Sequence, residues 1–356
     1  MKAKKVARKG KAKVERKTAL ATILYPLGTK ITTDNNTTKV VKQTANGVIS
    51  DEKLPNGEPK YRPLYKYTQY PDFRIPKTNK MLAEASKDDD IGNLKLRKNK
   101  RKTFSLSIAA ATQNSFGVNV CPSKSVGCES ACLMYSGGNW AYTSNIQGKI
   151  SKADYYIVHQ EEMLLRVLTE VIKACTKYNG QEVAFRLNVL SDLPIVEQIC
   201  KLSQKMNLQI PRNAIFYDYT KIPQKAGMWT TGTGHKYYVT FSRSEENEAQ
   251  VNAFLKGTLP MLIAPVFQMK TQGGIEQYPQ NGVDFPYTYR GYAVFDGDES
   301  DDRMIDDYEE LKAQYEAGVI KRPVAWLGLR GKRSKGKTLT AETTKEFFIN
   351  NWKKNP

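Results

Sequence analysis

The sequence predicts an α/β protein whose main domain is a TIM-like or partial (β/α) barrel. Short apolar segments typical of buried strands recur through the second two thirds of the chain. Helical segments or loops separate most of them, and polar residues follow several successive strands. Repeated βα units imply parallel strands joined by right-handed crossovers. A doubly wound open sheet has the same element pattern and is the alternative.

The first predicted strand is TFSLSIAAA at residues 103–111, and a cysteine-containing loop follows it. A long helix is expected near residues 146–176, because Ile150, Ile157, Leu164, Leu168, Val171 and Cys175 recur at helical spacing. The next unit pairs a strand at 182–192 with a helix at 195–206.

The remaining strands are expected at residues 214–221, 236–245, 259–267, 291–298 and 324–331. EENEAQVNAFLKG has the pattern of a helix, and DDYEELKAQYEAG that of a solvated helix. TTGTGHKYY at 230–238 lacks the spacing of a phosphate-binding loop and is interpreted as an ordinary loop.

Two segments are expected to precede the main domain, which is predicted to span residues 103–356. Residues 1–18 are predicted to be a disordered basic tail, because a like-charged segment buries too little surface to offset its ordering entropy. Residues 19–102 are predicted to be an irregular extension with a short strand pair and a Tyr/Pro-rich extended stretch.

The positive charge of the chain lies in three basic clusters. Residues 1–18, 95–102 and 330–337 carry +8, +6 and +5, which together account for the formal net charge of +19. Such clusters neutralise phosphates and release counterions, so nucleic acid is the leading partner class. Solvated tails that aid solubility are the alternative.

The sequence also bears on membranes and on redox compartment. No run of eighteen apolar residues occurs, so no membrane partner is expected. No apolar segment follows the basic N-terminus, which argues against a secretory signal peptide. Five cysteines in a reducing cytoplasm argue against a disulfide framework. The oligomeric state is left open.

Three cysteines follow the first predicted strand within NVCPSKSVGCESACLMYSGG. Cys121, Cys128 and Cys132 have the spacing C-x6-C-x3-C. Thiolates bind soft or borderline metals. The leading hypothesis is a 4Fe–4S cluster with one iron left open, and the alternatives are zinc with a fourth ligand from elsewhere or structural thiols. Cys175 and Cys200 lie on apolar helix faces and are expected in the core.

Polar residues at strand ends supply the other candidates, because functional groups of parallel sheets collect at the C-terminal ends of the strands. Predicted catalytic residues are Asp192, Asp218, Lys221 and Glu245. Predicted cofactor-binding or substrate-binding residues are Asn188, Ser191, Ser242, Arg243, Asp296 and Asp298.

The acidic stretch DGDESDDR supports a competing hypothesis. Asp296 or Asp298 is expected beside Asp192 and Asp218, where carboxylates would bind Mg²⁺ or Mn²⁺ and cleave phosphodiesters. That activity would be a nuclease or a replication-initiation protein. The simpler alternative is an acidic turn that leads into a solvated helix.

The string CPSKSVGCESACLMYSGG resembles the signature of the gene product 88-like proteins of bacteriophages. RLNVLSD, FYDYTK, VTFSRSEEN, APVF, VFDGDESDDR and GLRGK occur in the order of that family's blocks, over roughly residues 103–336. The resemblance implies a phage protein in the cytoplasm of the infected host cell. It also implies, more distantly, a radical-SAM-like barrel and S-adenosylmethionine, although radical SAM loops have the spacing C-x3-C-x2-C.

These patterns lead to three expected functions. The first is an iron–sulfur enzyme, radical-SAM-like, that acts on nucleic acid or a nucleotide. The second is the divalent-metal phosphodiesterase. The third is a non-enzymatic DNA- or RNA-binding protein with structural cysteines.

Overall fold

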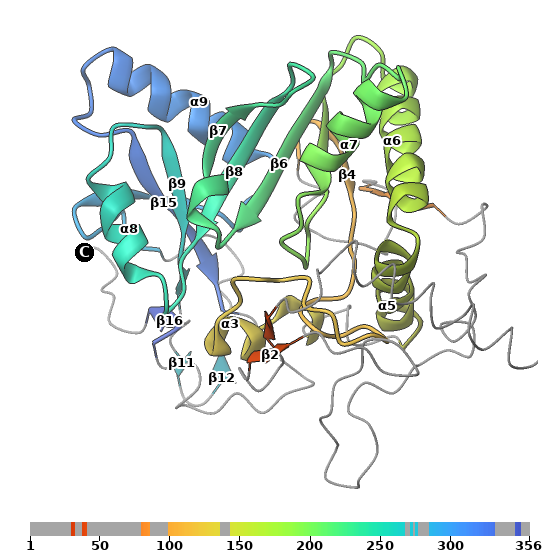
Figure 1. Ribbon diagram of the computed structural model, residues 1–356. Coiled ribbons are helices and arrows are strands. Elements are labelled where there is room, and N and C mark those ends of the chain that lie inside the picture. Colours follow the sequence, from red (N-terminus) through yellow and green to blue (C-terminus); the bar gives the residue numbers. More distant parts are fainter. Residues whose placement is uncertain are drawn as a thin grey trace, which may run out of the picture.

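The computed structural model describes residues 30–32, 38–40, 80–85, 99–135, 143–267, 271–272, 275–276, 285–331 and 346–349. Its centre is a mixed sheet that is mostly parallel (Figure 1). The parallel strands lie side by side in the order β4 (Lys102–Ser105), β5 (Val183–Arg186), β6 (Ala214–Thr220), β8 (Lys236–Ser242), β9 (Met261–Ala264), β15 (Val324–Arg330) and β14 (Tyr292–Asp296).

Antiparallel strands complete both ends of this sheet. β3 (Ala83–Glu84) pairs with β4, and β13 (Thr288–Tyr289) forms a hairpin with β14. The β13–β14 turn consists of Arg290 and Gly291, both with positive φ, as a two-residue hairpin turn requires. Because β3 lies within residues 19–102, the predicted extension contributes a strand to the main sheet.

Smaller strands lie beside the main ones. β7 (Gly227–Thr230) pairs antiparallel with β8, and Thr231–His235 is the tight turn between them, so TTGTGHKYY is part of a hairpin. β10 (Val266–Phe267) lies between β15 and β16 (Phe348–Ile349). Two separate antiparallel pairs are β1 (Lys30–Thr32) with β2 (Thr38–Val40), and β11 (Thr271–Gln272) with β12 (Ile275–Glu276).

The helices are α3 (Val126–Ser130), α5 (Thr143–Val158), α6 (Gln160–Lys177), α7 (Ile195–Lys205), α8 (Glu248–Leu255) and α9 (Arg303–Glu316), with short 3-10 turns η2 (Leu133–Tyr135) and η3 (Pro223–Lys225). The predicted helix at 146–176 is two helices. His159 separates them with φ −135° and ψ 51°, which are not helical. Glu161 and Glu162 then lie in the first turn of α6, where carboxylates favour a helix start.

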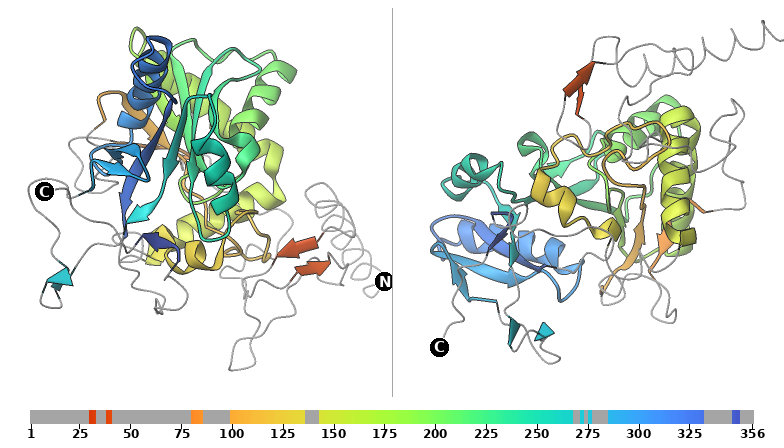
Figure 2. Two further views of the ribbon diagram at one scale, coloured as in Figure 1. Left: turned by 90° about the vertical axis from the view of Figure 1, so that its left-hand side faces the viewer. Right: turned by 90° about the horizontal axis from the view of Figure 1, so that it is seen from below.

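Helices cover both faces of the sheet. Side chains of α5, α6 and α7 pack with Phe185 and Phe216, and α8 packs with Phe241 and Ile263 on the same face. α9 packs on the other face, against Tyr217 and Leu262. In the left view of Figure 2 the strands lie between α9 on one side and α6 and α7 on the other.

The barrel prediction is not confirmed, whereas the α/β class and the mostly parallel sheet are. From β4 to β9 each parallel strand is added beyond the previous one, as in a barrel. The order then reverses, because β15 inserts between β9 and β14. A right-handed crossover that steps backward must place its helix on the opposite face, and α9 lies there. Within the described ranges no strand pairing closes the sheet, and two-faced helix packing matches the doubly wound alternative.

Other predicted boundaries also changed. The predicted strand at 103–111 ends at Ser105, and Leu106 still bonds to Arg186 and Val189 before the chain turns toward the cysteine loop. The predicted disordered tail at 1–18 lies outside the described residues. Across the part of the chain that is described, no helix has the length and apolarity to cross a membrane.

Candidate functional site

The parallel strands end at one edge of the sheet, and the cysteine loop lies across that edge. In Figure 1 the arrows of β6 and β15 point toward the side of the molecule where α3 lies. The loops after β5, β6 and β8 therefore meet the loop that carries the three cysteines. This edge is the place where parallel α/β sheets carry their binding sites.

Cys121 is fixed by contacts to two other backbone segments. Its Sγ accepts a hydrogen bond from the N–H of Ala111 at 3.3 Å and its thiol donates to the carbonyl of Leu190 at 3.2 Å. Ala111 has φ 48°, a left-handed conformation that is rare for a residue with a Cβ. Burial raises the pKa of the Cys121 thiol well above its usual range, and nearby Cys132, Cys128 and Asp192 add to the rise.

Lys221, which directly follows β6, lies against the second cysteine. Its ammonium interacts electrostatically with the Cys128 thiol. Burial lowers the pKa of the Lys221 ammonium, but the charges of Cys128, Asp192 and Cys121 outweigh that effect and raise it. The structure thus brings together five predicted site residues, namely Cys121, Cys128, Cys132, Asp192 and Lys221.

Asp192 connects three segments of this edge. Its carboxylate accepts from the Thr220 hydroxyl at 2.8 Å and from the Lys221 N–H at 3.0 Å. Lys225 lies 3.5 Å away in an ion pair, and the Asp192 N–H donates to the carbonyl of Val120, just before Cys121. Asp192 therefore holds loops in place with both of its oxygens.

Asp218, two residues before Thr220 on β6, belongs to a second network, which is buried. It accepts from the Asn188 N–H at 2.8 Å, from the Asn188 side-chain amide at 3.1 Å and from the Tyr237 hydroxyl at 3.2 Å. Ser191 donates to the Asn188 amide oxygen at 2.9 Å. Burial raises the pKa of Asp218 to about 7, against the opposing effects of Arg186 and these hydrogen bonds. Asn188 therefore hydrogen-bonds to both Asp218 and Ser191.

The residues after β8 hold two other segments. Glu245 accepts from the Ser125 hydroxyl at 2.9 Å and from the Gly127 N–H at 2.6 Å, at the start of α3. Arg243 donates to the carbonyls of Glu346 and Phe347, both at 2.9 Å. Ser242 ends β8, opposite Ala264 of β9, and its carbonyl accepts from Asn247. Glu245 and Arg243 thus hydrogen-bond to other segments of the chain.

Asp296 and Asp298 do not join the other aspartates, which corrects the expected carboxylate cluster. Asp296 ends β14 and Asp298 lies two residues beyond it, and β15, β9 and β8 lie between β14 and β6. Neighbouring strands are about 4.8 Å apart, so the separation is several strand widths. Asp296 accepts from the Asp298 N–H at 2.8 Å, and Asp298 accepts from the Arg330 N–H at 2.7 Å.

The structure also shows contributors that the sequence pattern did not identify. Ser125 is the N-cap of α3 and accepts from the Cys128 N–H at 3.1 Å. Lys124 and Glu129 form a buried ion pair within the same loop. Ser125 has the sequence signal of a helix N-cap. The approach of Phe347 to Gly127 has no local signal, because these residues are far apart in the chain.

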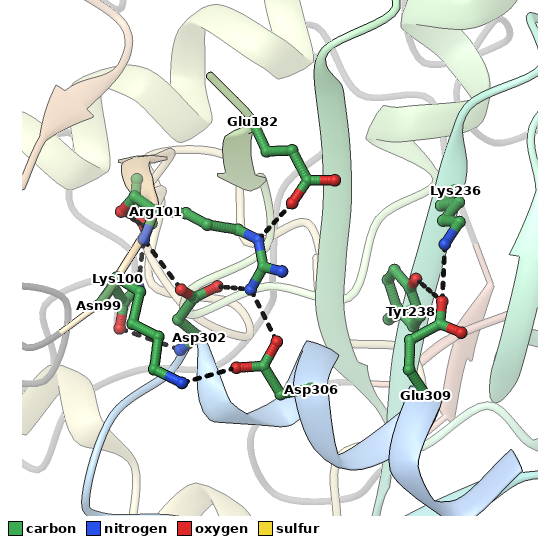
Figure 3. A network of polar contacts seen from close by, with 10 residues as sticks. Asn99, Lys100, Arg101, Glu182, Lys236, Tyr238, Asp302, Asp306 and Glu309 are labelled. Carbon is green, nitrogen blue, oxygen red and sulfur yellow. Dashed lines mark hydrogen bonds and ion pairs between the residues drawn. The ribbon is translucent and has the colours of Figure 1, made fainter. Parts of the chain in front are cut away.

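One part of the predicted nucleic-acid surface is paired with carboxylates. Figure 3 shows Arg101 between Glu182 at 2.8 Å and Asp302 and Asp306, both at 3.0 Å. Lys100 lies 3.4 Å from Asp306. Lys100 and Arg101 therefore face carboxylates just before β5 and at the start of α9, whereas Lys102 lies over the ring of Tyr178. Residues 1–18 and 332–337 lie outside the described ranges, and nucleic acid remains a predicted partner.

No group of three His, Cys, Asp or Glu side chains among the described residues is already arranged to hold a metal ion. A protein-family model described as Gene product 88 matches residues 77–326. This match confirms the resemblance seen in the cysteine loop and starts earlier than the predicted block pattern. No curated protein and no solved structure gives a significant match. The radical-SAM-like resemblance is not confirmed.

Proposed function

The chain belongs to the Gene product 88 family, and from that premise we propose that it is a phage-encoded enzyme with an iron–sulfur site. It would work in the cytoplasm of the infected host and act on nucleic acid or a nucleotide. The observation that carries the proposal is the position of the three-cysteine loop at the C-terminal edge of the sheet, where Asp192 binds the backbone of Val120, beside Cys121, and the backbone of Lys221.

The three cysteine thiols match an iron–sulfur cluster in ligand type and in number. Three thiols from one loop are soft ligands, and they leave one position of a 4Fe–4S cluster open. In the described residues the thiols do not yet converge on one point, so binding requires their side chains to turn toward a common centre. When bound, such a cluster would supply one-electron chemistry and an open coordination position.

The chain's own residues would support that site in three ways. The Lys221 ammonium would offset the negative charge of thiolate ligands, and the charges of Cys128, Asp192 and Cys121 raise its pKa. Asp192 fixes the backbone of Lys221 and of Val120 beside Cys121. Cys121 and Cys132 are partly buried and pack against the apolar core, which shields part of their thiols from water.

S-adenosylmethionine and a radical-SAM-like barrel receive less support. Asn188 and Ser191, at the end of β5, hydrogen-bond to each other, and Asn188 also binds Asp218. The reversed order of β15 and β14 departs from a barrel of consecutive strands. We therefore propose an iron–sulfur cluster and do not assign S-adenosylmethionine as its cosubstrate.

The alternative is a divalent-metal phosphodiesterase that uses the aspartates. It receives less support because Asp192, Asp218, Asp296 and Asp298 all accept hydrogen bonds from the protein. It predicts Mg²⁺- or Mn²⁺-dependent nicking of DNA that Asp296→Ala abolishes and Cys128→Ala leaves intact.

Iron, zinc and acid-labile sulfide analysis of anaerobically purified or reconstituted protein tests the proposal. We expect iron and sulfide in the natural chain, their loss from Cys128→Ala, and their retention in Cys175→Ala, whose thiol lies in the core. Zinc without sulfide would instead support a zinc site. A chain without metal whose salt-sensitive nucleic-acid binding depends on residues 1–18 would favour a non-enzymatic binding protein.

A further inference from the structure

A chain of hydrogen bonds connects the end of β8 to the backbone of Cys128. Glu245 accepts from the Ser125 hydroxyl at 2.9 Å, and the same hydroxyl oxygen accepts from the Cys128 N–H at 3.1 Å. The other carboxylate oxygen accepts from the Gly127 N–H at 2.6 Å. Glu245 therefore fixes the residue before Cys128 directly and Cys128 itself through Ser125.

Close packing reinforces these hydrogen bonds from the other side. A Cβ added at Gly127 would lie 2.5 Å from the Cβ of Phe347 and 2.8 Å from Oε1 of Glu245. Arg243, two residues before Glu245, holds Phe347 in this position through the carbonyls of Glu346 and Phe347. Gly127 is thus enclosed between the C-terminal segment 346–349 and the end of β8.

Cys121 is held by contacts that differ from those of Cys128. Cys121 is held by Ala111 and Leu190, whereas Glu245 bonds to Ser125 and Gly127. Cys128, in contrast, lies inside the turn that Glu245 closes through Ser125 and Gly127. A change at Glu245 should therefore act on Cys128 while leaving Cys121 in place.

We propose that Glu245 is a positioning residue that holds Cys128 against Lys221 through Ser125 and the backbone of Gly127. Both oxygens of Glu245, a predicted catalytic residue, accept hydrogen bonds from the cysteine loop. That Cys128 is a cluster ligand rests on the proposed function, whereas the restraint by Glu245 does not. The restraint on Cys128 exists in the metal-free chain and is tested there.

The experiment measures alkylation of each cysteine by iodoacetamide in the reduced, metal-free full chain, resolved by mass spectrometry. Loss of charge-assisted hydrogen bonds makes local opening easier. We expect Glu245→Ala to speed alkylation of Cys128 by about tenfold, which corresponds to about 1.4 kcal/mol. Cys121 and the core thiol of Cys175 should react at the rates of the natural chain.

Matched variants separate positioning from general loss of structure. Glu245→Gln keeps one oxygen that can accept from Gly127, so it should restore most of the natural rate at Cys128. Glu246→Gln changes the exposed neighbouring carboxylate and should have no effect. Ser125→Ala and Glu245→Ala should be non-additive in the double variant, because they remove parts of one hydrogen-bond chain.

Equal acceleration at Cys121, Cys128 and Cys175 in Glu245→Ala, or an unchanged rate at Cys128, would overturn the inference. So would failure of Glu245→Gln to differ from Glu245→Ala. Iron and sulfide content is measured separately on the natural chain. Absence of both alongside the expected alkylation pattern would remove the proposed function and leave the positioning role of Glu245 standing.

Discussion

Arg186 donates a hydrogen bond to Asp301 at 2.7 Å and thereby joins the end of β5 to the turn before α9. The two side chains are 10% and 0% exposed. The guanidinium also lies 4.5 Å from the ring centroid of Tyr219. This pair anchors the acidic turn of DGDESDDR to the sheet. At least one aspartate of that turn therefore has a structural role that requires no metal.

We predict that Asp301→Ala destabilises the protein by about 3–5 kcal/mol, because it leaves a buried guanidinium without its carboxylate. Urea unfolding followed by circular dichroism measures the change. Replacing both partners, as in Arg186→Met with Asp301→Leu, should recover part of the loss. Glu310→Ala, at an exposed position of α9, should stay within about 0.5 kcal/mol of the natural chain. A mild effect of Asp301→Ala would mean that the pair is not buried in solution.

The contacts of Arg101 give a second prediction. Its partner Asp302 is 2% exposed, whereas the partner of Lys100, Asp306, is 39% exposed. Arg101→Ala should therefore cost about 2–3 kcal/mol, since a buried carboxylate loses its charge-assisted hydrogen bond. Lys100→Ala should cost less than about 1 kcal/mol, as exposed ion pairs do. Comparable unfolding midpoints for the two variants would contradict this difference.

Two glycines provide a matched pair for the packing of the cysteine loop. Gly127→Ala places a methyl group against Phe347 and Glu245 and should destabilise by about 1–3 kcal/mol. Gly148 lies in α5, where an added Cβ meets nothing within 4 Å. Gly148→Ala should stabilise by about 0.5–1 kcal/mol, because alanine favours the helix. Thermal melting of both variants checks the opposite signs.

The buried carboxyl of Asp218 predicts a pH dependence of stability. Burial raises its pKa to about 7 and that of Asp154 to about 6, whereas the ordinary value is 3.8. Between about pH 4 and pH 7 the folded chain thus retains protons that the unfolded chain has released. Stability should fall as the pH rises through this window and level off above it.

Asp218→Asn tests that assignment. The variant should be less stable by about 1–3 kcal/mol at low pH, because its amide nitrogen would face the donors of Asn188 and Tyr237. It should also show a smaller fall in melting temperature between pH 4.5 and pH 7.5. An unchanged slope would show that Asp218 does not titrate in this range, and Asp154→Asn then isolates the other buried carboxyl.

Sequence patterns predicted where the polar residues would lie, but they did not predict what those residues bind. Cys121, Asp192 and Lys221 follow strands, and the ends of parallel strands share one edge, so their meeting was predictable. The roles of Glu245 and Arg243 were not, because their partners are Gly127 and Phe347 from distant segments. A polar residue after a strand has the same sequence signature whether it binds a substrate or a loop.

The sequence by itself determined the α/β class, most of the strands, the cysteine loop and the family. These features depend on periodicity and on local motifs, which neighbouring residues encode. Only the tertiary structure decided that β15 inserts between β9 and β14, that α9 covers the second face and that Asp296 lies away from Asp218. Strand order depends on which apolar faces pack best, and that choice involves residues far apart in the chain.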